Sequence, residues 1–175
     1  MNTVVVYQSK TGFTKTYAEW IAKELNCDLK ENVNLTVKDI INYDTIIYGG
    51  GLYAVSVCGI GLIKKNFETL KEKNLIVWAT GCSPGHKEEM QQLWAHNFTQ
   101  EQLSHIKTFY LRGGFNYQSL SKEYKILMGM LKMKLKATKN RTQDENDLLK
   151  AYEEPQDYRT ISNIYPLIEH VKTLH

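Results

Sequence analysis

The sequence predicts an α/β fold: a doubly wound, mostly parallel sheet of five strands with helices on both faces. Short apolar runs of strand length alternate along the chain with longer segments whose apolar residues recur at helical spacing. Three of the strand-like runs also end at glycines, which is typical of strands that pass into loops. With 175 residues and no internal repeat, the chain has the length of one such domain.

The strands are expected in five places. The first is a continuous β-branched run, as in a strand buried on both faces of a parallel sheet, and the second is the weakest of the five. In chain order they are Thr3–Tyr7, Cys27–Lys30, Thr45–Tyr48, Leu75–Ala79 and Thr108–Leu111.

Amphipathic segments between and after these strands predict the helices. In the first helix the apolar residues recur at intervals of three and four, which gathers them on one face. The expected helical segments are Thr14–Leu25, a short turn around Val37–Ile41, Gly61–Lys71, Lys87–Phe98, a long helix within Leu120–Arg141 and a closing helix near Asn163–Leu174.

Composition excludes several classes of protein. Hydrophobic residues make up 42% and charged residues 23%, which argues against disorder, and no stretch approaches the roughly 18 apolar residues of a membrane span. The cysteines (Cys27, Cys58, Cys82) and the five histidines show no metal-ligand or disulfide-framework spacing, so we expect no metal site and a reduced, cytoplasmic protein. The net charge of +3 is too small, and too little interleaved with aromatic residues, to indicate nucleic acid.

The predicted topology places a ligand site beyond the carboxyl ends of the strands, where the strand order reverses. Three loops leave those ends: Gln8–Lys15, Gly49–Gly59 and Thr80–His86. The first contains Ser9, Lys10, Thr11, Gly12, Phe13 and Thr14 just before a helix. Its hydroxyls, a turn-permitting glycine and the helix N-terminus together suit a phosphate monoester, although each hydroxyl alone could be an ordinary helix cap.

This hexapeptide has the form [ST]-x-T-G-x-T and resembles the phosphate loop of flavodoxins. The resemblance implies FMN as the cofactor and the strand order 2-1-3-4-5. Neither the glycine pattern of dinucleotide-binding folds nor a Walker lysine pattern is present.

The same resemblance implies that the second and third loops enclose the flavin ring, through Gly51, Leu52 and Tyr53 and through Thr80, Gly81, Cys82 and Ser83. Tyr53 is the candidate for stacking on the ring, although it could equally be an ordinary core or surface tyrosine. The glycines of the second loop either approach the ring or mark a tight turn. Cys58 is either a redox thiol or a small buried hydrophobe. The third loop lacks the aromatic residue that many flavodoxins place there, so one face of the ring could be open to a substrate or partner.

The C-terminal third contains a basic, Met-rich helical insertion near 115–141 and an acidic segment at 142–158. The stretch FYLRGGFNYQSLSKEYKILMGMLKMKLK resembles the corresponding region of the flavodoxin-like protoporphyrinogen dehydrogenases, many of whose wider relatives need not act on porphyrin. Thr142 and Glu145 form a capping box that predicts a short helix in the acidic segment.

The long helix has three faces with different expected roles. One apolar stripe is expected to dock on the sheet: Leu120, Tyr124, Leu127, Leu131 and Leu135. A second apolar stripe has no evident place in a simple surface helix: Ile126, Met130, Met133 and Ala137. This second stripe, together with lysines on the remaining face, indicates contact with a membrane surface or an acidic partner. The lysines are Lys122, Lys125, Lys132, Lys136 and Lys139. The alternative is local pairing of these lysines with the acidic residues that follow: Asp144, Glu145, Asp147, Glu153 and Glu154.

The function expected is that of an FMN-binding flavodoxin-like protein, acting in electron transfer or as a flavin-dependent oxidoreductase, with a redox partner or small-molecule substrate. No catalytic residue is assigned. Two alternatives stay open: a protoporphyrinogen dehydrogenase of heme biosynthesis peripheral to the inner membrane face, and a non-enzymatic binding module. The positive net charge departs from the acidic character of small electron-carrying flavodoxins and weakens that reading.

Overall fold

The computed structural model describes residues 2–53 and 55–174. Its central sheet has the strand order β2-β1-β3-β5-β6, with every neighbouring pair parallel. The five strands are β1 (Thr3–Gln8), β2 (Asp28–Glu31), β3 (Thr45–Tyr53), β5 (Asn74–Gly81) and β6 (Ile106–Arg112). The predicted fold class and order 2-1-3-4-5 are therefore confirmed. A short strand, β4 (Ser56–Val57), returns antiparallel along the end of β3.

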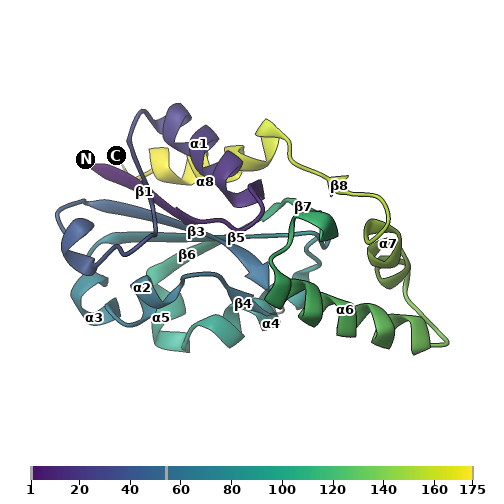
Figure 1. Cartoon of the computed structure of the whole chain (residues 1–175). Coiled ribbons are helices and arrows are strands. Elements are labelled where there is room, and N and C mark those ends of the chain that lie inside the picture. The colour runs from purple at the N-terminus through teal and green to yellow at the C-terminus, as the bar shows by residue number, and fades with distance from the viewer. Residues whose placement is uncertain (1, 54, 175) are drawn as a thin grey trace.

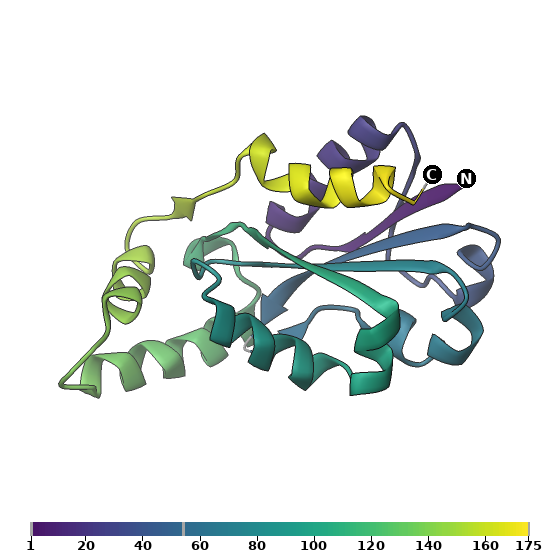
Figure 2. The ribbon, with the colours of Figure 1, turned by 180° about the vertical axis from the view of Figure 1, so that it is seen from behind.

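Helices cover both faces of the sheet (Figures 1 and 2). On one face lie α1 (Phe13–Leu25), η3 (Ile161–Ile164) and α8 (Tyr165–Lys172), which pack against the strand residues Val5, Ile47 and Trp78 and their neighbours. On the other face lie η1 (Val37–Asp39), α2 (Gly61–Lys64), α3 (Phe67–Leu70), α4 (Lys87–Asn97) and α5 (Gln100–His105). Since side chains alternate along a strand, each face supplies its own core, and both are apolar.

Two helical predictions needed correction. The single helix expected over Gly61–Lys71 is two short helices, and Asn66, whose side chain donates to the Leu62 carbonyl at 2.8 Å, lies at the break. The helix α5 was not expected, although Thr99 and Gln102 form a capping box at its start that the sequence displays.

The glycines of the second loop have a structural explanation. Gly49 and Gly50 lie inside β3, not in a turn. A Cβ at Gly49 would lie 1.9 Å from the Trp78 ring, and one at Gly50 would lie 2.5 Å from the Cys58 carbonyl oxygen. These two glycines therefore make room for a core tryptophan and for the returning chain, whereas Gly51, the last of the run, lines the cavity described below.

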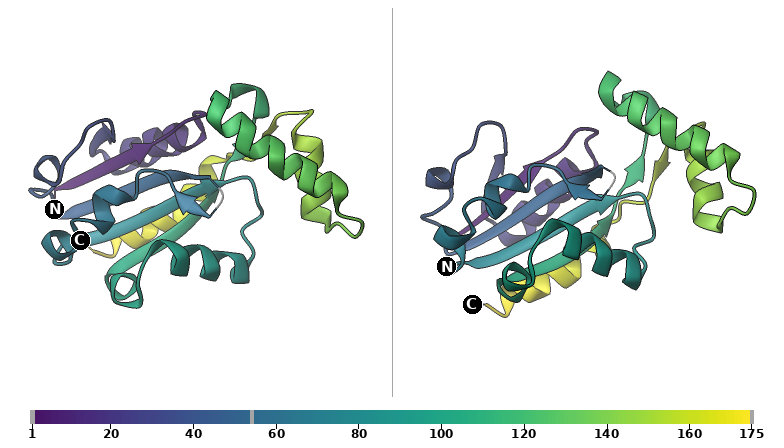
Figure 3. Two further views of the ribbon diagram at one scale, coloured as in Figure 1. Left: turned by 60° about the horizontal axis from the view of Figure 1, so that its bottom comes forward. Right: turned by 90° about the horizontal axis from the view of Figure 1, so that it is seen from below.

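Residues 116–155 form an arm outside the three-layered body of sheet and flanking helices. The arm contains η2 (Tyr117–Ser119), α6 (Lys122–Ala137) and α7 (Gln143–Ala151), and extends past the carboxyl ends of the parallel strands (Figure 3). Its base is a two-stranded antiparallel ribbon of β7 (Gly114–Phe115) and β8 (Gln156–Asp157). The capping box predicted at Thr142 is present at the start of α7.

The expected docking of α6 on the sheet is wrong. Its apolar side instead packs on α7 and on a small separate core, made of Phe115, Leu120, Ala151 and Tyr152 with partly buried neighbours. Tyr152 ties the two helices together, because its hydroxyl donates to the Met128 carbonyl at 2.6 Å. Across residues 2–53 and 55–174, no helix has both the length and the apolarity needed to cross a bilayer.

Candidate functional site

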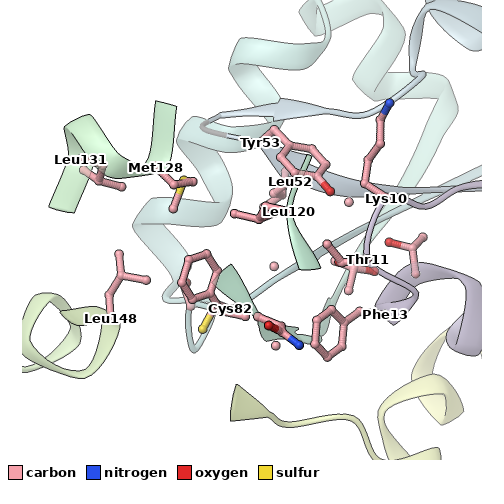
Figure 4. Close-up of a pocket in the computed structure, with 18 of the residues that line it drawn as sticks. Lys10, Thr11, Phe13, Leu52, Tyr53, Cys82, Leu120, Met128, Leu131 and Leu148 are labelled. Carbon is pink, nitrogen blue, oxygen red and sulfur yellow. The ribbon is translucent and has the colours of Figure 1, made fainter. Parts of the chain in front are cut away.

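A cavity of about 360 Å³ lies at the carboxyl edge of the sheet, between the body and the arm (Figure 4). All three predicted loops line it, and so does the arm. Of the predicted site residues, the cavity brings together Lys10, Thr11, Phe13, Thr14, Gly51, Leu52, Tyr53, Thr80, Gly81, Cys82 and Ser83. Ser9 and Gly12 shape the first loop without lining the cavity wall.

The first loop ends in a helix N-terminus that is open to an anion. Gly12 has φ +89°, a left-handed conformation that favours glycine, and its N–H donates to the Ser9 hydroxyl oxygen at 3.1 Å. The Ser9 hydroxyl hydrogen is therefore available to another acceptor. α1 begins immediately afterwards with no acidic residue in its first turn, and the first N–H groups of a helix have no partner within the helix.

Thr80, near the end of β5, has a buried hydroxyl for which the described residues offer no hydrogen-bond partner. The residue is 5% exposed, and its Oγ1 has no hydrogen-bond partner within the described part of the chain. Buried hydroxyls are normally paired, because leaving one unpaired costs about 1–3 kcal/mol. Since Thr80 also lines the cavity, a polar ligand atom would complete it.

Tyr53 faces an aromatic partner from the arm. Its ring lies 4.2 Å from that of Tyr124, centroid to centroid, at an interplanar angle of 36°. The Lys10 ammonium lies 5.9 Å from the centre of the Tyr124 ring, so the arm meets the first loop here as well. Burial raises the pKa of Tyr53 far above its usual value, and a hydrogen bond with Thr11 opposes this. The phenol is therefore neutral.

The third loop is held by contacts from its neighbours. Tyr110 donates its hydroxyl to the Ser83 carbonyl at 2.8 Å, and Arg112 donates through Nε to the Cys82 carbonyl at 3.1 Å. Ser83 in turn donates to Glu89 at 2.6 Å. Burial raises the pKa of the Cys82 thiol, which keeps it protonated at neutral pH. The third loop thus gives the cavity a fixed wall in which the Cys82 thiol is neutral.

Two further residues of the second and third loops lie elsewhere. Cys58 is not among the cavity-lining residues, and burial raises the pKa of its thiol, which disfavours a redox role. His86 lies outside the cavity lining too, with its Nε2 3.0 Å from Oδ2 of Asp144 in α7. It links the body to the arm.

The arm supplies the apolar end of the cavity. Figure 4 shows Met128 and Leu131 of α6 facing Leu148 of α7, with Thr11 and Phe13 at the opposite end. The arm-side lining also includes Phe115, Asn116, Leu120 and Leu127. Sequence reasoning missed this wall, because it assigned Leu127 and Leu131 to the sheet.

Arg159, beyond the arm, was also missed. Its guanidinium lies 4.8 Å from the centre of the Phe13 ring and donates to the Thr16 hydroxyl at 2.7 Å. Asp157 holds it through two hydrogen bonds, of 2.9 and 2.6 Å. Arg159 therefore fixes the first turn of α1 from outside the site.

Comparisons with known proteins agree with this architecture. The model of the flavodoxin domain family matches residues 4–143. No curated protein matches the sequence.

Three solved structures illustrate the range of similarity. Trp repressor binding protein from Bacillus subtilis has a TM-score of 0.50 at 12% identity, covering 81% of this chain and all of its own. Oxidised flavodoxin 2 from Bacillus cereus scores 0.42 at 14% identity, covering 76% of this chain and 99% of its own. A flavoprotein from Lactobacillus acidophilus, crystallised in complex with FMN, scores 0.40 at 19% identity, covering 63% and 91%. At 12% identity the first of these shows a shared fold alone.

Proposed function

Because the chain belongs to the flavodoxin domain family, we propose that it binds FMN in this cavity and acts as an FMN-dependent oxidoreductase. One observation carries the proposal: a single cavity connects a hydroxyl-rich loop at a helix N-terminus with the unpaired hydroxyl of Thr80. The first feature suits a phosphate, and the second suits a polar atom of the ring.

At the phosphate end, Thr11 and Thr14 would donate hydroxyl hydrogens from the cavity lining, and the first N–H groups of α1 would add theirs. Ser9 lies just outside that lining and would donate only to a phosphate oxygen that extends beyond it. Apart from its two chain neighbours, no described atom lies within 4 Å of where a Cβ of Gly12 would be, so the loop is open on this side. The partial positive charge of the helix end favours a phosphate dianion.

At the ring end, the side chains of this protein would position the flavin ring and set the polarity of its surroundings. The flavin would supply the one- or two-electron chemistry. Thr80 would pair with a polar ring atom, while Leu52 and Tyr53 would contact the ring on one side. Cys82 and Tyr53 stay neutral because burial raises the pKa of both, so neither adds a charge that would shift the potential.

The arm favours an enzyme over a soluble electron carrier. Met128, Leu131 and Leu148 enclose an apolar space next to the ring end. A carrier that exchanges electrons through an exposed ring edge does not require such a wall, whereas a small apolar substrate does.

Protoporphyrinogen as the substrate receives less support. A porphyrinogen carries carboxylates that need cationic partners, and Lys10 is the one cation among the described residues that line the cavity. A non-enzymatic binding module is the remaining alternative. Its affinity for FMN would be weak or absent, which distinguishes it from an FMN-dependent enzyme.

The test is a titration of the purified protein with FMN, followed by flavin fluorescence. We expect saturable quenching, and at least about tenfold weaker binding in the T11A/T14A variant, because each hydrogen bond to a charged acceptor contributes about 1.5–3 kcal/mol. The matched control is T36A/T99A, which removes two cap hydroxyls remote from the cavity. That control should lose stability but not affinity. Absence of quenching by the wild-type protein would favour the binding module.

A further inference from the structure

No described residue outside α6 covers the outward side of this helix. Ile126, Met130 and Met133 are 68%, 55% and 67% exposed, although all three are large apolar side chains. Residues at i, i+4 and i+7 share one face of a helix, so the three form a continuous outward stripe over two turns. Residues on the other side of the same helix, including Met128 and Leu131, line the cavity. Packing within the chain therefore does not explain the outward stripe.

Lysines flank the outward stripe on both sides. In a helical projection, Lys134 falls on one side of the stripe and Lys122 and Lys136 fall on the other, and all three lysines are exposed. The helix contains one acidic residue, Glu123, whose carboxylate accepts from the Ser121 hydroxyl at 2.8 Å. An apolar stripe bordered by lysines is the pattern of a helix that lies in a membrane surface.

The local alternative, pairing with the acidic segment, is not realised. Over the described residues, no ion pair joins an α6 lysine to an acidic residue of the 142–158 segment. Asp144 contacts His86 instead, and Asp147 contacts Lys150. Of the arm lysines predicted to share a face, Lys132 turns inward, with its ammonium 5.1 Å from the centre of the Tyr152 ring. The charge of the outward lysines thus remains available to a partner.

We propose that the outward stripe of α6 docks on the surface of an anionic phospholipid bilayer. The apolar side chains enter the headgroup boundary, and Lys122, Lys134 and Lys136 contact lipid phosphates while their aliphatic stems cover apolar surface. The arm projects from the body, so a flat surface can reach this side of α6 (Figures 1 and 3). A bilayer fits better than a folded acidic partner, because lysines on both edges of a straight apolar strip match a planar charged surface.

Cosedimentation of the full-length protein with vesicles tests the proposal. The vesicles are of phosphatidylcholine alone or with phosphatidylserine. We expect binding to the anionic vesicles that weakens with salt, since exposed charges are screened over about 8–10 Å at moderate ionic strength. The K122E/K134E/K136E variant should bind at least roughly tenfold less, because each lysine near an anionic surface contributes about fivefold. The control K23E/K38E/K107E changes the net charge equally at exposed lysines of the body and should retain binding.

The apolar contribution has its own variant. I126S/M130S/M133S should reduce binding to anionic vesicles at high salt, whereas the control L29S/V33S/I161S, at exposed apolar residues of the body, should not. Three results would overturn the proposal. They are equal sedimentation with both kinds of vesicle, an equal loss of vesicle binding in both charge-reversal variants, and unchanged vesicle binding in the I126S/M130S/M133S variant. Self-association in sedimentation velocity that the serine variant abolishes would overturn it as well, because a second copy would then be the occupant. An FMN titration of the same preparations reports separately on the cavity.

Discussion

Replacing Thr80 by valine should change stability and ligand affinity in opposite directions. The Thr80 hydroxyl is buried and unpaired within the described residues, so the apoprotein bears its desolvation cost. Valine has nearly the same shape, suits a strand, and exchanges the hydroxyl for a methyl group. Removing an unpaired buried hydroxyl should stabilise the apoprotein by about 1 kcal/mol. For a chain of this length, that corresponds to a rise in Tm of about 2–4 °C.

The same substitution removes the group that is proposed to meet a polar atom of FMN. The loss of one neutral hydrogen bond is worth about 0.5–1.5 kcal/mol, so affinity should fall about two- to tenfold. Thermal unfolding without FMN and a fluorescence titration with it measure the two effects on one preparation. Added FMN should raise the Tm of the wild-type protein more than that of T80V, because ligand stabilisation follows affinity.

Thr45 provides the matched control. It is fully buried in β3, and its Oγ1 accepts a hydrogen bond from the Asn74 side chain at 3.3 Å. T45V should therefore destabilise the apoprotein and leave FMN affinity unchanged. If T80V destabilised the apoprotein as T45V does, or left FMN affinity at the wild-type value, the role assigned to the Thr80 hydroxyl would be refuted.

Three further predictions concern the body and its junction with the arm. G49A should lower the free energy of unfolding by about 2–3 kcal/mol in denaturant titrations, because its Cβ would lie 1.9 Å from the Trp78 ring. The control G61A, whose Cβ would lie 3.9 Å from its nearest neighbour, should leave the free energy of unfolding nearly unchanged. A double-mutant cycle of Y53L and Y124L should give a coupling energy of about 0.5–1.5 kcal/mol, and additive effects would mean that the two rings do not stabilise the arm together. Arg159 lowers the pKa of Asp157 below its ordinary value of 3.8, so their interaction contributes stability above that value and loses it as the pH falls through the lowered one. D157N should accordingly be less stable than wild type at neutral pH, by a margin that shrinks in acid unfolding measurements, and a constant margin at all pH values would contradict the pairing.

The alternation of strands and helices was sufficient to predict the sheet and its carboxyl-edge loops, because both follow from local periodicity and chain topology. The location of α6 was not predictable in this way. Periodicity shows that a helix has an apolar face, but it does not show which body that face contacts. Leu127 and Leu131 were predicted to face the sheet, whereas they line a cavity together with Leu148, a residue to which the sequence assigned no role.

Within the site, the hydroxyl-rich loop was recognisable because its residues are adjacent in sequence. Tyr124 and Arg159 could not be recognised as neighbours of the first loop, because they are far from it in sequence. The arm brings Tyr124 to Lys10, and the segment that follows the arm brings Arg159 to Phe13. The glycine run was a different case. The sequence left open whether Gly49 and Gly50 approach the ring or mark a tight turn, and the size of Trp78 and the path of the chain at Cys58 explain them instead.

The ribbon at the base of the arm has an evolutionary consequence. Gly114 pairs with Asp157 and Phe115 with Gln156, and the Tyr158 N–H donates to the Gly113 carbonyl at 2.7 Å. The chain therefore leaves and re-enters the body at one point, as it would in a hairpin. The entropy of closing a loop grows slowly, by about 0.6 kcal/mol for each doubling of its length. Descendants of this sequence could lengthen, shorten or replace everything between Phe115 and Gln156 while the parallel sheet keeps its register, so this position can acquire new specificities without a new fold.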